Sequence, residues 1–405
     1  MTNKQTAIKI IRILHKNGFQ ALLAGGCVRD MLLGKRAKDY DVATDARPEQ
    51  IIKLFKRTLE VGAKFGVVIV LFEKQQFEVA TFRTESGYYD GRHPSKVEFA
   101  NPVEDAARRD FTVNGMFYDT AQEKVIDYVK GRADLKKRVI RTIGDPAARF
   151  GEDYLRMLRA IRFATQLEFK IEPKTWAAVC KWSNKIKHIS GERICTELEG
   201  ILANPNRSTG AECLVQSGLA EAIFGLDRKE AKVGIKVLES LPEKVDFPLA
   251  LAGFLAGCKT GHSLEKLRVL KLSRRAIKHI KFLLENRDRL LDDKMSLAKL
   301  KLFLSEPYFY DLFEFQKAIQ KVQARDTIVL SGLKKRIKAL GDVELKPKPL
   351  LNGHELIKLG AVPGPSLGQL AQEMYIAQLE GDIKTKPHTK KWVQKWLENH
   401  RNTGK

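Results

Sequence analysis

The apolar pattern of this chain changes character near Pro146, and this change constrains the fold more than any other feature. Before it, short apolar runs such as 67–72 and 77–82 are rich in Val, Ile and Phe and are bounded by glycines, as in strands separated by turns and helices. After it, apolar residues recur three or four positions apart, as at Leu155 and Leu158. The sequence therefore predicts an α+β head with a mixed sheet, followed by an all-α remainder.

The length of 405 residues exceeds what one hydrophobic core supports, so several compact parts are expected. Loop-forming residues cluster near 204–206 and 346–349, within the helical part. These signals and the change near Pro146 predict four parts. Their expected bounds are 1–145, 146–205, 206–345 and 346–405.

Charge and cysteine usage exclude several classes of protein. The 72 Lys and Arg residues against 49 Asp and Glu give a formal net charge of +23, which favours a polyanionic partner such as RNA or DNA. No apolar stretch is long enough to span a bilayer and no signal-peptide pattern is present, so a cytoplasmic protein without membrane contact is expected. The five cysteines include no CxxC pair and the histidines form no HExxH motif, which argues against disulfide frameworks and common zinc sites.

Two glycines lie between an apolar run and an expected helix in the segment 23–30, Leu-Ala-Gly-Gly-Cys-Val-Arg-Asp. Gly25 and Gly26 would let the backbone approach a ligand closely, and Arg29 would add positive charge for a phosphate group. Taken alone, this segment is more typical of an ordinary turn between a strand and a helix.

A pair of acidic residues follows in the segment 38–41, Lys-Asp-Tyr-Asp. On a strand, Asp39 and Asp41 would lie on one face, because side chains alternate. Their mutual repulsion would be relieved by a divalent cation, and oxygen ligands suit Mg²⁺. The alternative is an exposed pair of aspartates in a turn.

Two arginine-rich motifs complete the set. The segment 107–114, Ala-Arg-Arg-Asp-Phe-Thr-Val-Asn, places guanidinium groups that suit phosphate near an apolar anchor, although a surface cluster of ion pairs would have the same composition. In the segment 149–163, charged residues three positions apart predict one polar stripe on a helix, with ion pairing within that helix as the alternative. The residues of this stripe are Asp153, Arg156, Arg159 and Arg162.

In their order, the motifs GGxVRD, DxD, RRDFTxN and EDxxRxLRxxRF resemble those of the class II tRNA nucleotidyltransferases and bacterial poly(A) polymerases, the CCA-adding enzyme family. The resemblance runs from about residue 22 to 201 and returns more faintly at 350–357 and 378–381. It implies a nucleotidyltransferase head of the polymerase-beta type at 1–145. It also implies a helical neck that recognises the base and a helical body and tail that bind RNA, matching the other three expected parts.

The resemblance also implies roles for residues of the head. Gly26, Arg29 and Arg109 match nucleotide contacts, while Asp39 and Asp41 match the ligands of a catalytic Mg²⁺. Gly25 and Asn114 lie in the same motifs and are expected to contact the nucleotide, and Glu78 is similar to the third catalytic carboxylate. The segment 84–96 resembles a flexible loop linked to addition of the terminal A.

The neck motif resembles the family's amino-acid template, which implies that Asp153 and Arg156 read the base while Arg159 and Arg162 assist with phosphate or stacking. Hydrogen-bond polarity supports this interpretation independently. Cytosine and adenine each present an amine beside a ring-nitrogen acceptor, which fits a carboxylate that accepts and a guanidinium that donates. Uracil and guanine present the reverse polarity.

The resulting hypothesis is a Mg²⁺-dependent enzyme that adds C, C and A to the 3′ end of tRNA from CTP and ATP and releases pyrophosphate. Poly(A) polymerases and enzymes adding only part of CCA share these motifs and stay open as alternatives, although Ala63 and Lys64 look more like the tRNA enzymes. A non-catalytic RNA-binding protein on the same scaffold is a further alternative. The sequence makes no prediction of oligomeric state.

Overall fold

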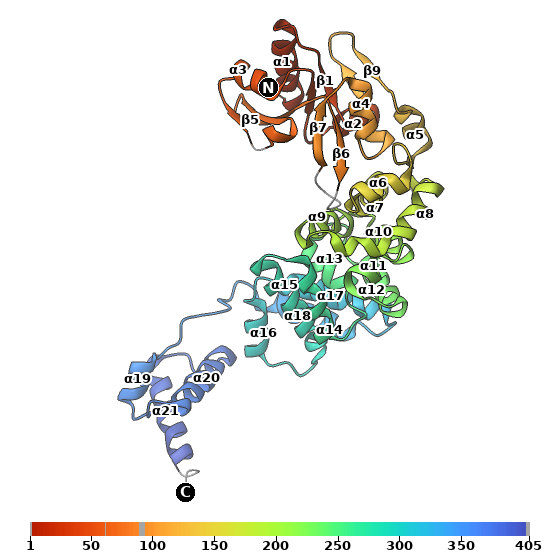
Figure 1. Ribbon diagram of the computed structural model, residues 1–405. Helices are drawn as coiled ribbons and strands as arrows, with labels where there is room; N and C mark the ends of the chain where they lie inside the picture. The colour runs from red at the N-terminus through yellow and green to blue at the C-terminus, as the bar shows by residue number, and fades with distance from the viewer. Residues whose placement is uncertain (1, 61, 89–93, 402–405) are drawn as a thin grey trace. The chain divides into compact units, whose positions relative to one another are not determined.

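A computed structural model describes residues 2–60, 62–88 and 94–401 (Figure 1). The chain divides into two compact units. The first comprises Met1–Glu239 and Glu243–Ser273, and the second comprises Ser240–Pro242 and Arg274–Lys405. The predicted fold class is confirmed: a mixed sheet flanked by helices at the N-terminal end is followed by a mostly helical remainder.

The head is built on a seven-stranded sheet with the order β3-β4-β5-β2-β1-β8-β9. Neighbouring strands are antiparallel except β2 and β5, which are parallel. The strands are β1 (Ala21–Ala24), β2 (Asp41–Thr44), β3 (Thr58–Leu59), β4 (Val67–Phe72), β5 (Gln75–Thr81), β8 (Phe117–Asp119) and β9 (Lys124–Ile126). A separate hairpin consists of β6 (Arg83–Tyr88) and β7 (Pro94–Phe99).

Alternation along the central strands explains how the sheet is covered. Leu22 and Ala24 of β1 belong to a buried cluster with Phe82, Ala106 and Phe117, which joins the sheet to α4. The helix α1 packs against β1 and β2 through its apolar side. The helices of the head are α1 (Asn3–Lys16), α2 (Gly26–Leu32), α3 (Pro48–Leu54), α4 (Pro102–Arg108) and α5 (Gly131–Lys137).

The first helices after the head form two segments rather than one. Asp145 caps α6 (Pro146–Glu152), accepting a hydrogen bond from the Ala148 amide, and Pro146 suits the first helical position. Asp153 then adopts an extended conformation, with φ −148° and ψ 106°, before α7 (Leu155–Leu167) begins. The prediction of a single stripe from Asp153 to Arg162 is therefore wrong at its start, because Asp153 precedes the helix that carries the arginines.

The helix α7 packs against α9 (Gly191–Leu202) and α10 (Arg207–Gln216). A Cβ atom on Gly200 would lie 2.5 Å from Arg162 Cδ, so the glycine allows this arginine to cross α9 closely. The short parallel pair β10 (Val139–Ile140) and β11 (Lys170–Ile171) links the end of the head to the helices that follow. The other helices of this unit are α8 (Pro173–Trp182), α11 (Leu219–Phe224), α12 (Arg228–Ser240), α13 (Phe247–Phe254) and α14 (Thr260–Lys266).

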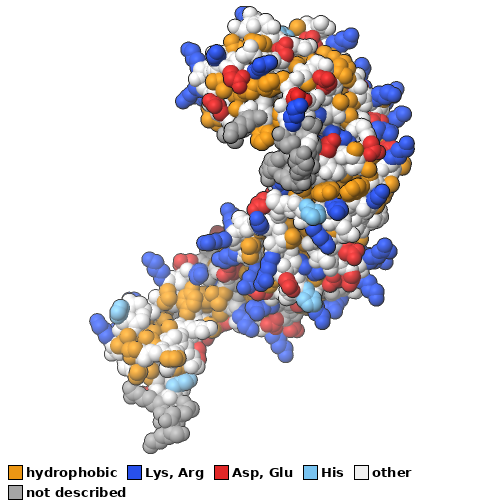
Figure 2. Space-filling model, viewed as in Figure 1, with side chains coloured by type: hydrophobic (Ala, Val, Ile, Leu, Met, Phe, Trp, Pro, Cys, Tyr) orange, Lys and Arg blue, Asp and Glu red, His pale blue; other side chains and the backbone are white. Residues whose placement is uncertain are grey.

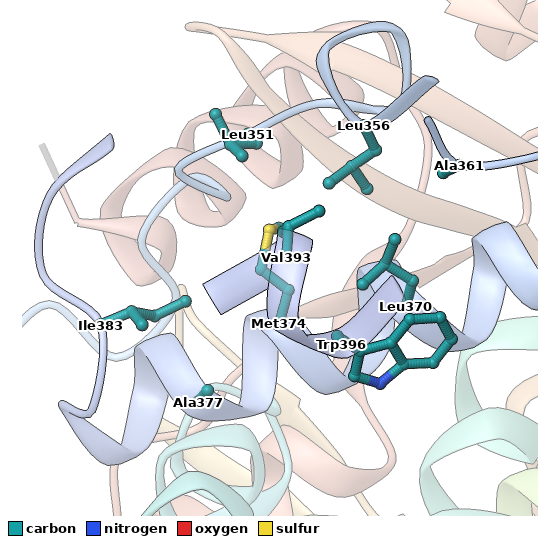
Figure 3. Packing of buried hydrophobic residues seen from close by; sticks show 9 residues of the cluster. All are labelled: Leu351, Leu356, Ala361, Leu370, Met374, Ala377, Ile383, Val393 and Trp396. Carbon is teal, nitrogen blue, oxygen red and sulfur yellow. The ribbon is translucent and has the colours of Figure 1, made fainter. Parts of the chain in front are cut away.

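The second unit is helical, and its C-terminal part has a hydrophobic core of its own. Figure 3 shows nine buried residues of this core, among them Leu356, Met374 and Trp396. The Trp396 Nε1 donates a hydrogen bond to Glu373 Oε2 at 2.7 Å, so the indole is buried without losing its polar contact. The helices of this unit are α15 (Arg274–Asn286), α16 (Leu297–Leu304), α17 (Phe309–Val322), α18 (Ile328–Leu340), α19 (Gly353–Lys358), α20 (Pro365–Glu380) and α21 (Lys386–Arg401).

Lys and Arg side chains are spread widely over the face of the molecule shown in Figure 2. This distribution agrees with the expectation of a polyanionic partner. Among the described helices, none has both the length and the apolar character needed to cross a bilayer. All five cysteines are free thiols, and Cys27 and Cys258 are buried, as expected of core residues.

Candidate active site

A cavity of about 420 Å³ lies within the first unit, walled by the head and by the helices α7 and α9. Nine of the residues predicted from the motifs line it. They are Gly25, Gly26, Arg29, Asp41, Arg109, Asn114, Asp153, Arg156 and Arg159. Four motifs that are far apart in the sequence therefore meet around one space.

The Gly-Gly turn brings the backbone close to the charged groups of the cavity. Gly25 has φ 75° and ψ −132°, a conformation that favours glycine. A Cβ atom on Gly25 would lie 3.1 Å from Arg109 Nη1 and 4.0 Å from Asp41 Oδ2. The pairing of Ala24 with Asp41 between β1 and β2 explains why the turn and the acidic residue share one edge of the sheet.

Carboxylates gather at the start of β2. Parallel pairing of Val42 with Val79 places Asp41 beside Glu78, one residue earlier on each strand. Burial and the negative charges of Glu78 and Asp39 raise the pKa of Asp41 to about 6, although Arg109 opposes the shift. Asp39 is exposed and precedes the strand, so the expectation that both aspartates lie on β2 is wrong, while their electrostatic proximity is present.

These carboxylates suit a divalent cation. They supply oxygen ligands, and the raised pKa of Asp41 reflects burial of its charge together with repulsion from Glu78 and Asp39, which a cation would relieve. Glu78 and Asp39 do not line the cavity itself. Asp39, Asp41 and Glu78 therefore form an acidic edge of the cavity, at which Asp41 faces inward.

The two arginines of the RRD motif are held by a buried carboxylate. Asp105, with 1% of its side chain exposed, accepts hydrogen bonds from Arg108 through Oδ1 and from Arg109 through Oδ2, at 2.7 and 2.9 Å for the shortest contacts. Arg109 uses Nε and Nη2 for this pair, which leaves Nη1 facing Gly25. Asp105 itself was not singled out from the sequence, although its spacing of three and four from the arginines is typical of helical ion pairs.

A second network joins the head to α7. Asp110 Oδ2 accepts from Arg159 Nε and Nη2 at 2.9 and 2.7 Å, and Asp110 Oδ1 accepts from Asn114 Nδ2 at 3.3 Å. Asn114 Oδ1 in turn accepts from Arg29 Nη1 at 2.7 Å. Burial would raise the pKa of Asp110, but Arg159 and these hydrogen bonds hold it below its ordinary value.

The two residues expected to read the base are not paired with each other. Asp153 Oδ2 accepts from Arg193 Nη2 at 2.7 Å, whereas Arg156 Nη1 donates to Glu152 Oε2 at 2.5 Å. Both side chains line the cavity and are mostly buried, with 16% and 10% of their surface exposed. The alternative in which Asp153 simply braces Arg156 within one helix is therefore wrong.

Arg162 does not line the cavity, contrary to the expectation of a nucleotide contact there. Its Nε donates to Glu197 Oε2 on α9 at 2.6 Å, and its guanidinium lies 4.2 Å from the centre of the Phe163 ring. Phe163 does line the cavity and also lies beneath Arg29 and Arg159, at 5.4 and 5.3 Å. Arg162 therefore contributes to packing between α7 and α9.

Sequence reasoning missed further lining residues, notably Arg193 and Glu85. Arg193 is 40 residues from its partner, and no local pattern marks it. Of the segment resembling a loop for terminal A addition, residues 84–88 and 94–96 lie on β6 and β7, whereas 89–93 fall outside the described residues. Ala63 belongs to a short 3₁₀ helix, while the side chain of Lys64 lies outside what the structure describes.

Two family models match the chain. Residues 21–141 match the poly A polymerase head domain. Residues 168–228 match a segment described as the probable RNA and SrmB-binding site of polymerase A.

Similar proteins are named CCA-adding enzymes. The Enterococcus faecalis enzyme is 36% identical over 389 residues, covering 94% of this chain and 93% of the relative. The Bacillus subtilis enzyme is 45% identical over 224 residues, and this alignment spans 55% of the chain and 56% of the relative. The chain thus aligns with about half the length of some relatives and with nearly all of others.

Solved structures agree with these matches. The Bacillus stearothermophilus CCA-adding enzyme in complex with CTP superposes with a TM-score of 0.82 at 27% identity, covering 100% of both chains. A Thermotoga maritima CCA-adding enzyme complexed with tRNA has the same fold, with a TM-score of 0.68 at 21% identity and coverage of 96% and 94%.

Proposed function

The chain belongs to the family of CCA-adding enzymes, and we infer that it adds C, C and A to the 3′ end of tRNA from CTP and ATP, releasing pyrophosphate. One observation carries this inference: the Gly-Gly turn, the acidic edge, the RRD arginines and the base-reading pair all converge on one cavity. Relatives that align along nearly their whole length bear the same name. The activity is therefore that of a nucleotidyltransferase.

Arg29 and Arg109 would bind the triphosphate, since both guanidinium groups line the cavity next to the Gly-Gly turn. Asp105 fixes two nitrogens of Arg109, so Nη1 is left toward the position where a phosphate can approach Gly25. The absence of a Cβ atom at Gly25 keeps this approach open. The chain thereby orients the α-phosphate for attack by the tRNA 3′-hydroxyl.

A divalent cation, for which we propose Mg²⁺, would be held by Asp41 and Asp39 with Glu78 beside them. When bound, it would supply neutralisation of phosphate charge and lower the pKa of the attacking hydroxyl. Asp41 must be ionised for this role, and its pKa of about 6 without the cation leaves it ionised at neutral pH. Glu78 and Asp39 keep the edge negative.

Asp153 and Arg156 would select the base. The carboxylate accepts from the amine of C or A, while the guanidinium donates to the neighbouring ring nitrogen. Each side chain already has a separate partner of opposite charge, so neither neutralises the other. Arg159 would support this wall through Asp110 rather than by reading the base.

We also propose the roles of the four parts: catalysis in 1–145, base recognition in 146–205, and tRNA binding in 206–345 and 346–405. The family segment at 168–228 and the net charge of +23 support RNA binding beyond the head.

The decisive test uses three RNAs: tRNA lacking CCA, tRNA ending in CC, and an unrelated RNA, each incubated with CTP or ATP alone. We expect C addition to the first, a single A on the second and no extension of the third. Repeated A addition to the unrelated RNA would instead indicate a poly(A) polymerase. Chelating divalent cations, followed by return of Mg²⁺, tests the metal separately.

A further inference from the structure

Arg193 lies on the cavity wall beside Asp153, although the two residues are 40 positions apart in the chain. Its guanidinium forms an ion pair with the Asp153 carboxylate at 2.7 Å, from the first turn of α9. We propose that Arg193 is a positioning residue for base selection, which holds the Asp153 carboxylate in place and keeps it from pairing with Arg156. This inference rests on the proposed function, because it assigns how the same site achieves selectivity.

The two oxygens of Asp153 are fixed from different sides. Oδ1 accepts from the Leu155 amide at 3.0 Å, and Oδ2 accepts from Arg193 Nη2 at 2.7 Å. An ionised carboxylate has about four acceptor positions, so lone pairs remain for the amine of an incoming base. An ionised carboxylate can only accept hydrogen bonds, which matches the donor that the amine of C or A presents.

Removing Arg193 would leave Asp153 among other cations of the same wall. Arg156 lines the cavity with it, and the negative charge of Asp153 contributes to the raised pKa of Arg159. A released carboxylate would be drawn toward these guanidinium groups. Pairing with Arg156 would occupy both members of the template and cancel the polarity that distinguishes C and A from U and G.

Arg193 is not needed to hold α9 against α7. One turn further along α9, Glu197 accepts from Arg162 of α7 at 2.6 Å. Among the described residues, Asp153 is the sole side chain that accepts a hydrogen bond from Arg193, and Arg193 Nη1 is buried without a partner. The described side-chain contact of Arg193 is therefore made to Asp153 and not to a residue of α7.

The experiment compares Arg193→Met, which removes the charge, with Arg193→Lys, which keeps it. The matched control is Glu192→Gln on the same turn of α9, where the exposed Glu192 pairs with Lys271 at 3.2 Å outside the cavity. The kcat/KM for CTP and ATP is measured against UTP and GTP on tRNA acceptors. We expect Arg193→Met to lose about tenfold in discrimination, Arg193→Lys to restore part of it, and Glu192→Gln to match the wild type.

Combining the change with Asp153→Ala tests the mechanism. If Arg193 acts through Asp153, Arg193→Met causes no further loss of discrimination in the Asp153→Ala background. The same additional loss in both backgrounds would overturn the proposal. A lower melting temperature with unchanged discrimination would also overturn it, because this is what a helix brace predicts.

Two outcomes separate this inference from the proposed function. A wild-type protein that transfers neither C nor A contradicts the proposed function itself. A selective wild type beside an equally selective Arg193→Met contradicts only the role of Arg193. If Arg193→Met does not fold, Arg193→Gln, which keeps a donor without the charge, is subject to the same expectations.

Discussion

Two carboxylates line the same cavity, yet their surroundings move their pKa values in opposite directions. On the head, burial and the charges of Glu78 and Asp39 raise the pKa of Asp41 to about 6. Facing α7, burial acts on Asp110 too, but Arg159 and hydrogen bonds lower its pKa. The difference lies in the balance of nearby charges: two carboxylates beside Asp41 act against Arg109, whereas Asp110 is paired directly with Arg159.

This contrast distinguishes the carboxylates around Asp41, whose negative charges suit a cation, from a wall whose charges are already paired within the protein. The acidic edge around Asp41 concentrates negative charge that a ligand cation would neutralise. The wall formed by α7 and α9 has an acidic partner for each arginine, as in the pairs of Arg156 with Glu152 and Arg159 with Asp110. Preorganised groups of this kind lose little entropy when they bind a base.

The largest effect is expected at the acidic edge. Asp41→Asn should lower kcat/KM for nucleotide transfer at least about a thousandfold, or about 4 kcal/mol, because it removes charge from the proposed metal site. Single-turnover transfer of C to tRNA measures this, with tRNA binding expected to persist.

The control is Asp45→Asn, just beyond the other end of β2. Asp45 is exposed, and its Oδ1 accepts a hydrogen bond from the backbone amide of Gln20 at 2.8 Å, which an Asn side chain can also accept. This variant should keep wild-type rates. If Asp41→Asn retained activity within tenfold, the acidic edge would not be the catalytic region.

A smaller effect is expected on the wall formed by α7 and α9. Asp153→Ala should leave the amine of C or A unpaired and should reduce discrimination against U and G about ten- to a hundredfold, or about 1 to 3 kcal/mol. Incorporation of the four nucleotides is compared with that of Asp145→Ala. Asp145 lies outside the cavity and caps α6, so Asp145→Ala removes a capping hydrogen bond without changing the cavity wall. Equal loss of stability with intact selectivity in both variants would refute base reading by Asp153.

The smallest effect concerns stability against pH without divalent cations. Because the folded pKa of Asp41 exceeds its ordinary value, the folded state retains the proton between pH 3.8 and about 6, and stability falls as pH rises through that window. Asp41→Asn should therefore be more stable than the wild type at pH 7, on the order of 1 to 2 kcal/mol after allowance for solvent screening. The difference should vanish near pH 4.

Asp110→Asn should have the opposite effect on stability and should be less stable than the wild type at pH 7. Its lowered pKa contributes stability that is present above pH 3.8 and is lost as pH falls through the folded value. Melting temperatures of both variants across pH, repeated with Mg²⁺, check the comparison. Mg²⁺ should stabilise the wild type and not Asp41→Asn. If the melting temperatures of both variants shifted in the same direction relative to the wild type, the two regions would not differ as described.

Much of the site could be predicted because its groups lie within short motifs. The turn at Gly25, the place of Asp41 on a strand and the inward position of Arg156 all follow local patterns, although Asp39 precedes that strand. The predictions are wrong where one helical spacing is assumed from Asp153 through Arg162. Asp153 precedes its helix, and Arg162 faces α9 rather than the cavity.

The sequence by itself determined which chemical groups are present and how those within about four positions face one another, since helix and strand periodicity fix such neighbours. Tertiary structure alone decided the partners of the functional groups. Arg29 meets Asn114 across 85 residues, Arg159 meets Asp110 across 49, and Arg193 meets Asp153 across 40. These pairs depend on where α2, α7 and α9 lie in space, and no local spacing encodes that arrangement.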